Sequence, residues 1–237
     1  MEEKPLFGNY NERLFKSGFR KKLHEARFRW MAKNIIAFRI PQKRVFELGC
    51  FDAKTIDFLP SKPDLFVGYD ANWENALILA KEKWKEHPEY IFYESTNPSE
   101  IKETENSFDL AISMETLEHV NANLEELYID ILYRVTNDYI IITIPNEIGL
   151  LFLLKRIYKY LFQKRYMLKY TLKEVIYTTF SKTKKVERDE HKGYNYNETI
   201  GLLKQRFDVV KVQGVQFGYL PLFLNFTVGI VGRKSYE

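Results

Sequence analysis

Two carboxylates and an imidazole fall within the five-residue segment Glu115–His119. On a helix, Glu115, Glu118 and His119 would stand at positions i, i+3 and i+4, and side chains at that spacing share one face. Carboxylate oxygens and imidazole nitrogens are ligands for divalent metal ions. The segment therefore predicts a metal site on one face of a helix.

A site with three ligands needs a contribution from elsewhere, and the chain has four histidines. His191 is the best candidate for the fourth ligand, because it closes an irregular part of the chain just before a predicted helix. If no metal binds, His119 or His191 is the preferred general base. We expect His24 and His87 to be surface residues.

The elements around this segment alternate between apolar strands and amphipathic helices. Strands are expected at 44–48, 65–69, 90–93, 108–113, 139–144, 208–212 and 226–232, and helices at 55–59, 73–85, 123–135 and 197–206. This order predicts an α/β fold with a doubly wound, Rossmann-like sheet of seven mostly parallel strands. The last strand is expected to be antiparallel, because no long helix separates it from the strand before it.

Four segments divide the chain. Residues 1–43 form a basic segment with one or two amphipathic helices over 11–40, 44–146 form the core, 147–194 form an insertion, and 195–237 complete the sheet. In such sheets, ligands bind at the carboxyl ends of the strands. The candidate residues at those ends are Gly49, Asp70, Glu94, the segment from Ser113 to His119, and Asn146.

The bulk properties set limits on partners and location. The formal net charge of +4 favours anionic partners without demanding nucleic acid. A single cysteine, Cys50, excludes an internal disulfide and fits a reducing compartment. No secretory signal and no apolar run of roughly 18–20 residues is evident, so we expect a cytoplasmic location.

Gly49 and Asp70 predict a nucleotide-type cofactor cleft. A glycine at the end of the first strand lets the backbone turn tightly beside a ligand. A carboxylate at the end of the second strand, 21 residues further on, can accept hydrogen bonds from both hydroxyls of a ribose. An ordinary strand-to-helix turn with a solvated aspartate would show the same two residues.

Several segments together resemble the class I S-adenosylmethionine-dependent methyltransferases. The matching segments are Val45–Cys50, Val67–Asp70, Ser107–Ser113, Glu115–Val120 and Ile142–Asn146, in the family's order and spacing. The resemblance implies that Glu47 and Gly49 flank the methionine moiety, that Asp70 binds the ribose, and that Glu94 with Ser95 lies at the adenine. The further cofactor-binding residues that it implies are Cys50, Phe51, Ala71, Asn72, Ser113 and Met114. The chain departs from the family at Phe51 and Ala53, where the loop usually carries glycines.

The Glu-x-x-Glu-His pattern is similar to metal-dependent O-methyltransferases that act on small-RNA termini or on quinones. This resemblance implies that Glu115, Glu118, His119 and His191 hold a divalent metal, Mg²⁺ or Zn²⁺, which activates a hydroxyl group. The whole chain also looks like small methyltransferases of bacterial surface-polysaccharide clusters, which implies a glycan or glycolipid acceptor. The alternatives are an RNA 2′-O-methyltransferase, which the modest charge disfavours, and a non-catalytic binding module of the same fold.

The segment Leu150–Phe162 mixes apolar, aromatic and basic residues. It is too short and too charged to span a bilayer. Two interpretations remain: a lid helix packed on the core with its Lys and Arg stems buried, or a helix lying on an anionic membrane surface. The second would place the protein peripherally at the inner face of the membrane.

Overall fold

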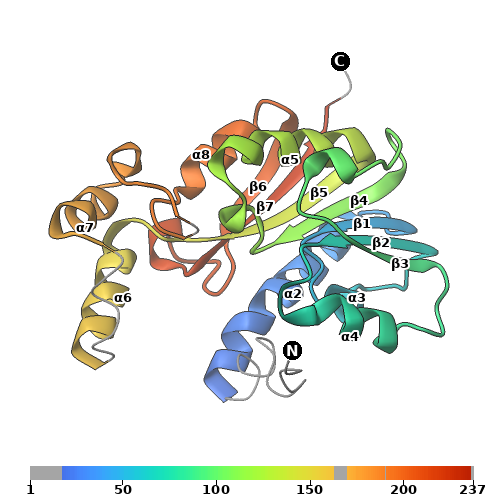
Figure 1. The fold of residues 1–237 in the computed structure, drawn as a ribbon, viewed down its shortest axis with the longest axis horizontal. Coiled ribbons are helices and arrows are strands. Elements are labelled where there is room, and N and C mark those ends of the chain that lie inside the picture. Colours follow the sequence, from blue (N-terminus) through green and yellow to red (C-terminus); the bar gives the residue numbers. More distant parts are fainter. Residues whose placement is uncertain (1–17, 163–169, 190, 236–237) are drawn as a thin grey trace, which may run out of the picture.

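The computed structural model describes residues 18–162, 170–189 and 191–235, and their strands form one seven-stranded sheet (Figure 1). The strands are β1 (Arg44–Leu48), β2 (Leu65–Asp70), β3 (Tyr90–Glu94), β4 (Phe108–Met114), β5 (Thr136–Pro145), β6 (Phe207–Gly214) and β7 (Thr227–Lys234). Their order is β3-β2-β1-β4-β5-β7-β6, and β7 is antiparallel to both of its neighbours. The Rossmann-like, mostly parallel sheet with an antiparallel last strand is thus confirmed.

Helices cover both faces of this sheet (Figure 1). The helices α5 (Ala122–Val135) and α8 (Tyr196–Leu203) pack on one face, and α2 (Gly18–Phe38), α3 (Thr55–Phe58) and α4 (Ala76–Lys83) on the other. The run of isoleucines in β5 is explained by burial on both faces of the sheet. Ile140 and Ile142 face the first layer of helices, and Ile141 between them faces the second, so all three are buried.

The predicted N-terminal helical segment is one helix, α2, across the part that the structure describes; residues 1–17 lie outside it. The indole of Trp30 packs on Gly229 of β7, where a Cβ atom would come within 2.6 Å of the ring. Its Nε1 donates a hydrogen bond of 3.1 Å to Gln213 of β6. These contacts fix α2 across the last strands.

Two predicted helices begin elsewhere than expected. The helix expected from Trp73 begins at Ala76, because Asn72, Glu74 and Asn75 have positive φ angles that interrupt a right-handed helix. Helix α5 begins at Ala122, one residue before expected, because Asn121 caps it by accepting a hydrogen bond from the backbone N–H of Asn123.

The insertion between β5 and α8 contains α6 (Gly149–Phe162) and α7 (Leu172–Thr179). Both project from the carboxyl end of β5 to one side of the sheet (Figure 1). Within the described chain, none of the helices combines the length and hydropathy needed to cross a membrane.

Candidate active site

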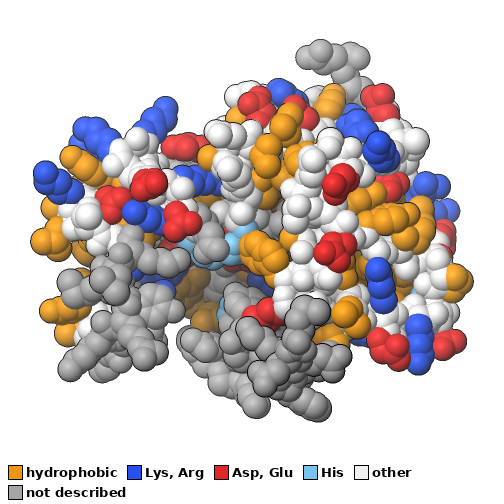
Figure 2. Space-filling model, viewed as in Figure 1, with side chains coloured by type: hydrophobic (Ala, Val, Ile, Leu, Met, Phe, Trp, Pro, Cys, Tyr) orange, Lys and Arg blue, Asp and Glu red, His pale blue; other side chains and the backbone are white. Residues whose placement is uncertain are grey.

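A cavity of about 550 Å³ opens at the carboxyl ends of β1, β2 and β4. It is lined by the loops that follow these strands, by one face of α2 and by the segment before α8. In Figure 2, histidine side chains lie in the hollow between the core and the insertion. The predicted site residues that line it are Glu47, Gly49, Cys50, Phe51, Asp70, Ala71, Ser95, Met114, Glu115, Glu118, His119 and His191.

The loop after β1 has backbone conformations that favour glycine at three positions, but only one of these positions holds a glycine. Gly49 has φ 76°, and Phe51 and Ala53 have φ 49° and 53°, in the left-handed region that glycine tolerates best. A left-handed conformation costs other residues roughly 1–2 kcal/mol each. A Cβ atom on Gly49 would lie 2.1 Å from the hydroxyl of Thr116, so this turn packs directly against the loop after β4. Phe51 and Ala53 therefore hold left-handed conformations with their side chains present, and this stores strain in the loop.

Asp70 ties the loops after β1 and β2 together. Its Oδ2 accepts from the backbone N–H of Phe51 at 2.9 Å, and its Oδ1 accepts from that of Asn72 at 2.7 Å. Burial raises the pKa of this carboxyl, while the backbone hydrogen bonds lower it. A carboxylate has about four lone-pair positions, so Asp70 can still accept a hydroxyl group from the cavity.

Other predicted cofactor residues differ in their surroundings. Glu47 is buried and accepts from the hydroxyl of Thr55, and burial raises the pKa of its carboxyl well above the ordinary value. Glu94 is exposed and accepts from the side-chain amide of Asn72 at 2.8 Å. Ser113 is buried within β4. Asn72, Glu94 and Ser113 are not among the residues that line the cavity.

The segment Glu115–His119 is not the helical face that its spacing predicts, and that prediction is wrong. Glu115 has φ 53°, and only Leu117–His119 form a single 3₁₀ turn. The cause lies in the sheet, because the Glu115 N–H donates to Thr143 of β5 at 2.8 Å and continues the strand pairing. The turn nevertheless directs the side chains of Glu118 and His119 into the cavity.

His191 joins these two side chains across the fold, as the sequence predicts. One ligand atom from each of Glu118, His119 and His191 lies within 4.8 Å of the others, and Glu115 is not in this set. The rings of His119 and His191 meet edge to face with centroids 4.6 Å apart. Trp73, from the loop after β2, packs edge-on against His119 at 5.2 Å. Three of the four predicted ligands thus converge.

The electrostatics of this cluster are unusual. Glu118 is completely buried, and neither carboxylate oxygen has a hydrogen-bond partner among the described residues. Burial raises the pKa of the Glu118 carboxyl well above its ordinary value, and the nearby Glu115 raises it further. Burial also raises the pKa of Glu115, against the lowering effect of Arg27 and Lys155. A buried carboxylate without partners costs several kcal/mol, so the site is suited to a cation.

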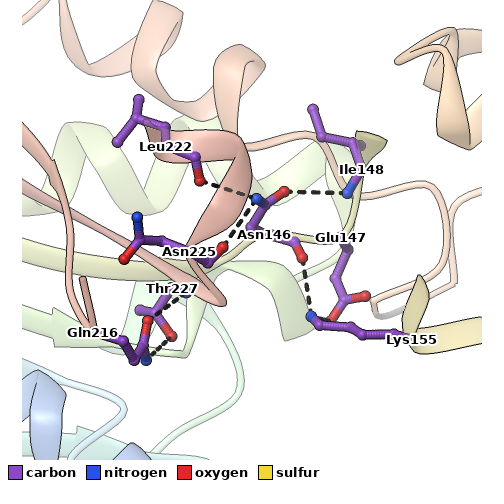
Figure 3. Close-up of polar contacts among 8 residues, drawn as sticks. All are labelled: Asn146, Glu147, Ile148, Lys155, Gln216, Leu222, Asn225 and Thr227. Carbon is purple, nitrogen blue, oxygen red and sulfur yellow. Dashed lines mark hydrogen bonds and ion pairs between the residues drawn. The ribbon is translucent and has the colours of Figure 1, made fainter. Parts of the chain in front are cut away.

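Polar contacts anchor the chain at the end of β5 (Figure 3). The Asn146 amide donates to the carbonyls of Leu222 and Asn225 at 3.2 and 3.0 Å. Lys155 of α6 reaches back and donates to the Asn146 carbonyl at 3.1 Å and to Glu147 at 3.4 Å. The start of the insertion is therefore fixed to the sheet.

The sequence prediction missed the contribution of α2. His24 is not the surface residue we expected, because it lines the cavity with Arg27 and Phe28. Their i, i+3 and i+4 spacing indicates a shared face, but nothing local indicates what that face meets. His87 is at the surface as predicted, with its side chain 43% exposed and 2.9 Å from Glu89.

Several solved structures share this fold. The methyltransferase domain of bacterial CtHen1 aligns with a TM-score of 0.57 at 16% sequence identity, over 89% of this chain and 99% of that one. Magnesium protoporphyrin IX methyltransferase from Synechocystis PCC 6803, with bound SAH, aligns with 0.60 at 15%, over 94% and 92%. The N-methyltransferase NodS from Bradyrhizobium japonicum WM9, in complex with S-adenosyl-L-homocysteine, aligns with 0.60 at 12%, over 98% and 95%. No family model and no curated protein matches the sequence. At these identities the likeness establishes a shared fold.

Proposed function

We propose that this protein is an S-adenosylmethionine-dependent methyltransferase that methylates a hydroxyl group with the help of a divalent metal ion. The observation that carries the proposal is the single cavity at the carboxyl edge of the sheet. Asp70 and the loop after β1 line it together with Glu118, His119 and His191. The residues proposed to bind the cofactor and those proposed to bind the metal therefore line the same cavity.

The cofactor end suits S-adenosylmethionine. Asp70 keeps acceptor positions for the ribose hydroxyls, and the tight turn at Gly49 leaves room for the methionine moiety. When bound there, S-adenosylmethionine supplies an electrophilic methyl group on a sulfonium centre. The protein's task is then to align the acceptor with that methyl group.

The metal end fits a divalent cation because Glu118 is buried, fully lacks hydrogen-bond partners among the described residues, and lies beside two imidazoles. Glu118, His119 and His191 would hold the ion, and the two nitrogen ligands favour a transition metal such as Zn²⁺ over Mg²⁺. A metal ion here supplies Lewis acidity that lowers the pKa of an acceptor hydroxyl. Glu115, which lies outside the set, increases the negative potential around Glu118.

The transfer step then needs alignment and proton removal. With S-adenosylmethionine bound, the cofactor would supply the methyl group, and the residues of the cavity would align the acceptor hydroxyl with it and remove the hydroxyl proton. His119 and His191 line the cavity, and either one would take that proton whenever its imidazole is not a ligand. Trp73, packed on His119, limits the rotation of that ring.

We infer a glycan, glycolipid or related small molecule as acceptor, and a cytoplasmic reaction. The support for this class is the likeness of the sequence to methyltransferases of polysaccharide clusters. Glu118 is buried and His119 and His191 are half-buried inside the cavity, and this supports a compact acceptor group that enters the cavity rather than a long polymer lying across the surface.

Titration calorimetry with S-adenosylmethionine tests the cofactor assignment directly, and we expect one site per chain. Absence of both heat and a thermal shift would favour a non-catalytic module of this fold. Methyl transfer from labelled cofactor is then measured on glycan, glycolipid and RNA acceptors, before and after chelation and after restoring Zn²⁺ or Mg²⁺. Transfer to RNA alone would contradict the acceptor class, and activity that ignores the chelator would leave only the histidine-base mechanism.

A further inference from the structure

Helix α6 presents an apolar face that the described residues do not cover. Leu150, Leu154, Ile157 and Leu161 stand at positions i, i+4, i+7 and i+11, which form one continuous face of a helix. Each side chain is between 46% and 62% exposed. Phe152, on another face of the helix, is only 2% exposed. The helix therefore packs through one side and leaves a second apolar side open.

Helix α7 repeats this arrangement. Leu172, Ile176 and the adjoining Phe180 follow one another at intervals of four residues. They are 79%, 56% and 70% exposed. Exposed apolar side chains are ordinary when scattered, but contiguous ones mark an interaction surface. We call the apolar faces of α6 and α7 together the insertion surface.

Positive charge accompanies the insertion surface. Residues 149–162 and 170–188 hold eight Lys and Arg against two Glu, whereas the net charge of the whole chain is only +4. Exposed lysines follow α7 at Lys182, Lys184 and Lys185, and Lys173 is exposed on α7 itself. Figure 2 shows apolar and basic side chains gathered over this lobe.

Contacts with the core hold these faces outward. Lys155 fastens α6 to the end of β5 through the carbonyl of Asn146 and the carboxylate of Glu147 (Figure 3). Lys192 forms an ion pair of 2.8 Å with Glu174 of α7, and this fastens α7 to the segment that carries His191. The apolar faces are therefore presented by a lobe that is fixed beside the cavity.

We propose that the insertion surface docks on an anionic lipid bilayer. Leucine, isoleucine and aromatic side chains on a basic amphipathic helix enter the boundary between headgroups and acyl chains, while lysines bind anionic headgroups. Nucleic acid would use the lysines but offers little to a Leu and Ile face. A second copy would bring the same positive charges together, which opposes self-association through this surface.

Vesicle flotation of the full chain tests the proposal without cofactor or acceptor, so the result is independent of the proposed methyl transfer. Phosphatidylcholine vesicles are compared with vesicles that also contain an equal amount of phosphatidylglycerol. We expect binding to the anionic vesicles that is much weaker on the neutral ones and that weakens with salt. Failure of the wild-type chain to bind anionic vesicles would overturn the proposal.

Paired variants locate the surface. Leu154→Gln with Leu161→Gln should lower partitioning at least about tenfold, and Lys184→Gln with Lys185→Gln should lower it by a similar factor. The matched control is Ile36→Gln with Ile78→Gln, whose side chains are 66% and 54% exposed on α2 and α4. Circular dichroism checks that every variant is folded.

Three other outcomes would each overturn the proposal. The first is an equal loss of binding in the α2 and α4 control. The second is sedimentation of a dimer that the α6 variant dissociates, without vesicle binding, because this would assign the surface to a second copy. The third is binding of an RNA homopolymer that depends on the lysines, without vesicle binding.

Discussion

The two ends of the cavity are built in opposite ways. At the cofactor end, each carboxylate oxygen of Asp70 accepts a hydrogen bond from a backbone N–H group. The two loops that Asp70 joins follow directly from two neighbouring strands. At the metal end, Glu118 is more deeply buried than Asp70, and neither of its oxygens has a hydrogen-bond partner among the described residues. The Nε2 atom of His119 lies 3.8 Å from one of these oxygens, and His191 comes from a segment more than 70 residues away. The Asp70 carboxyl of the first end is hydrogen-bonded to the backbone, whereas the Glu118 carboxyl of the second end lacks hydrogen-bond partners among the described residues.

The two ends of the cavity differ in the energetic cost that each imposes on the folded protein. The cofactor end stores backbone strain at Phe51 and Ala53, where left-handed conformations are imposed on residues with side chains. The metal end carries an electrostatic cost instead, because burial and the nearby Glu115 disfavour the charged form of the Glu118 carboxyl. The backbone strain at Phe51 and Ala53 does not depend on a cation, whereas a bound cation would reduce the electrostatic cost at Glu118.

The largest effect is expected from Glu118→Gln. The amide has the same shape but binds metal poorly, so metal affinity should fall at least about a hundredfold. The free energy of unfolding without metal should stay the same or rise, because the buried charge is gone. Metal titration and urea unfolding measure the two quantities, with the exposed Glu187→Gln as control. Lower stability with unchanged metal affinity would show that Glu118 is a structural residue.

Asp70→Asn should weaken S-adenosylmethionine binding about 10- to 100-fold, because hydrogen bonds to a charged acceptor contribute roughly 1.5–3 kcal/mol. Calorimetry measures the dissociation constant. The control is Asp208→Asn, an exposed aspartate on β6. Unchanged affinity in Asp70→Asn would remove the ribose role and weaken the contrast between the two ends.

A comparison of Phe51→Gly with Phe51→Ala isolates the backbone strain, because both remove the same ring. With φ at 49°, glycine should be more stable than alanine by about 1 kcal/mol, the reverse of the usual order. Urea unfolding measures the difference. Phe180, with φ −94° at the end of α7, is the matched position where alanine should be the more stable. If the glycine and alanine variants had the same order of stability at both positions, the proposed strain in the loop after β1 would be contradicted.

The smallest effect concerns the contact that holds α7 to the His191 segment. The hydrogen bond from Lys192, aided by Thr171, lowers the pKa of Glu174 from 4.5 to about 2. The stabilisation is therefore present above pH 4.5 and is lost as the pH falls toward 2. Glu174→Gln should flatten the decline of stability across this interval, measured by thermal unfolding. An equally steep decline in the variant would show that other carboxylates cause it.

Sequence patterns predicted the sheet well, because each strand carries its own signal. The Ile run of β5 indicates burial on both faces, and Ile140 to Ile142 alternate between the two layers. Helix starts were harder to predict. Asn72 and Asn75 adopt left-handed conformations that an amphipathic pattern does not reveal, so α4 begins later than expected.

The metal-ligand segment shows where local reasoning fails. A spacing of i, i+3 and i+4 predicts a shared face only if the backbone is helical. The Glu115 N–H is instead bonded to Thr143 of the neighbouring strand, and this separates Glu115 from Glu118 and His119. His24 was misplaced for a related reason, since the partner of its helix face is a distant edge of the sheet.

The sequence by itself determined the order of strands and helices and the placement of Gly49, Asp70 and Glu118 at strand ends, because apolar periodicity and turn residues act over short distances. It also indicated that His191 would join His119, although not how. Only the tertiary structure decided which carboxylate stands beside the two imidazoles and that the apolar faces of α6 and α7 remain open. Those outcomes depend on contacts between segments far apart in the chain, and no local pattern encodes the burial that they produce.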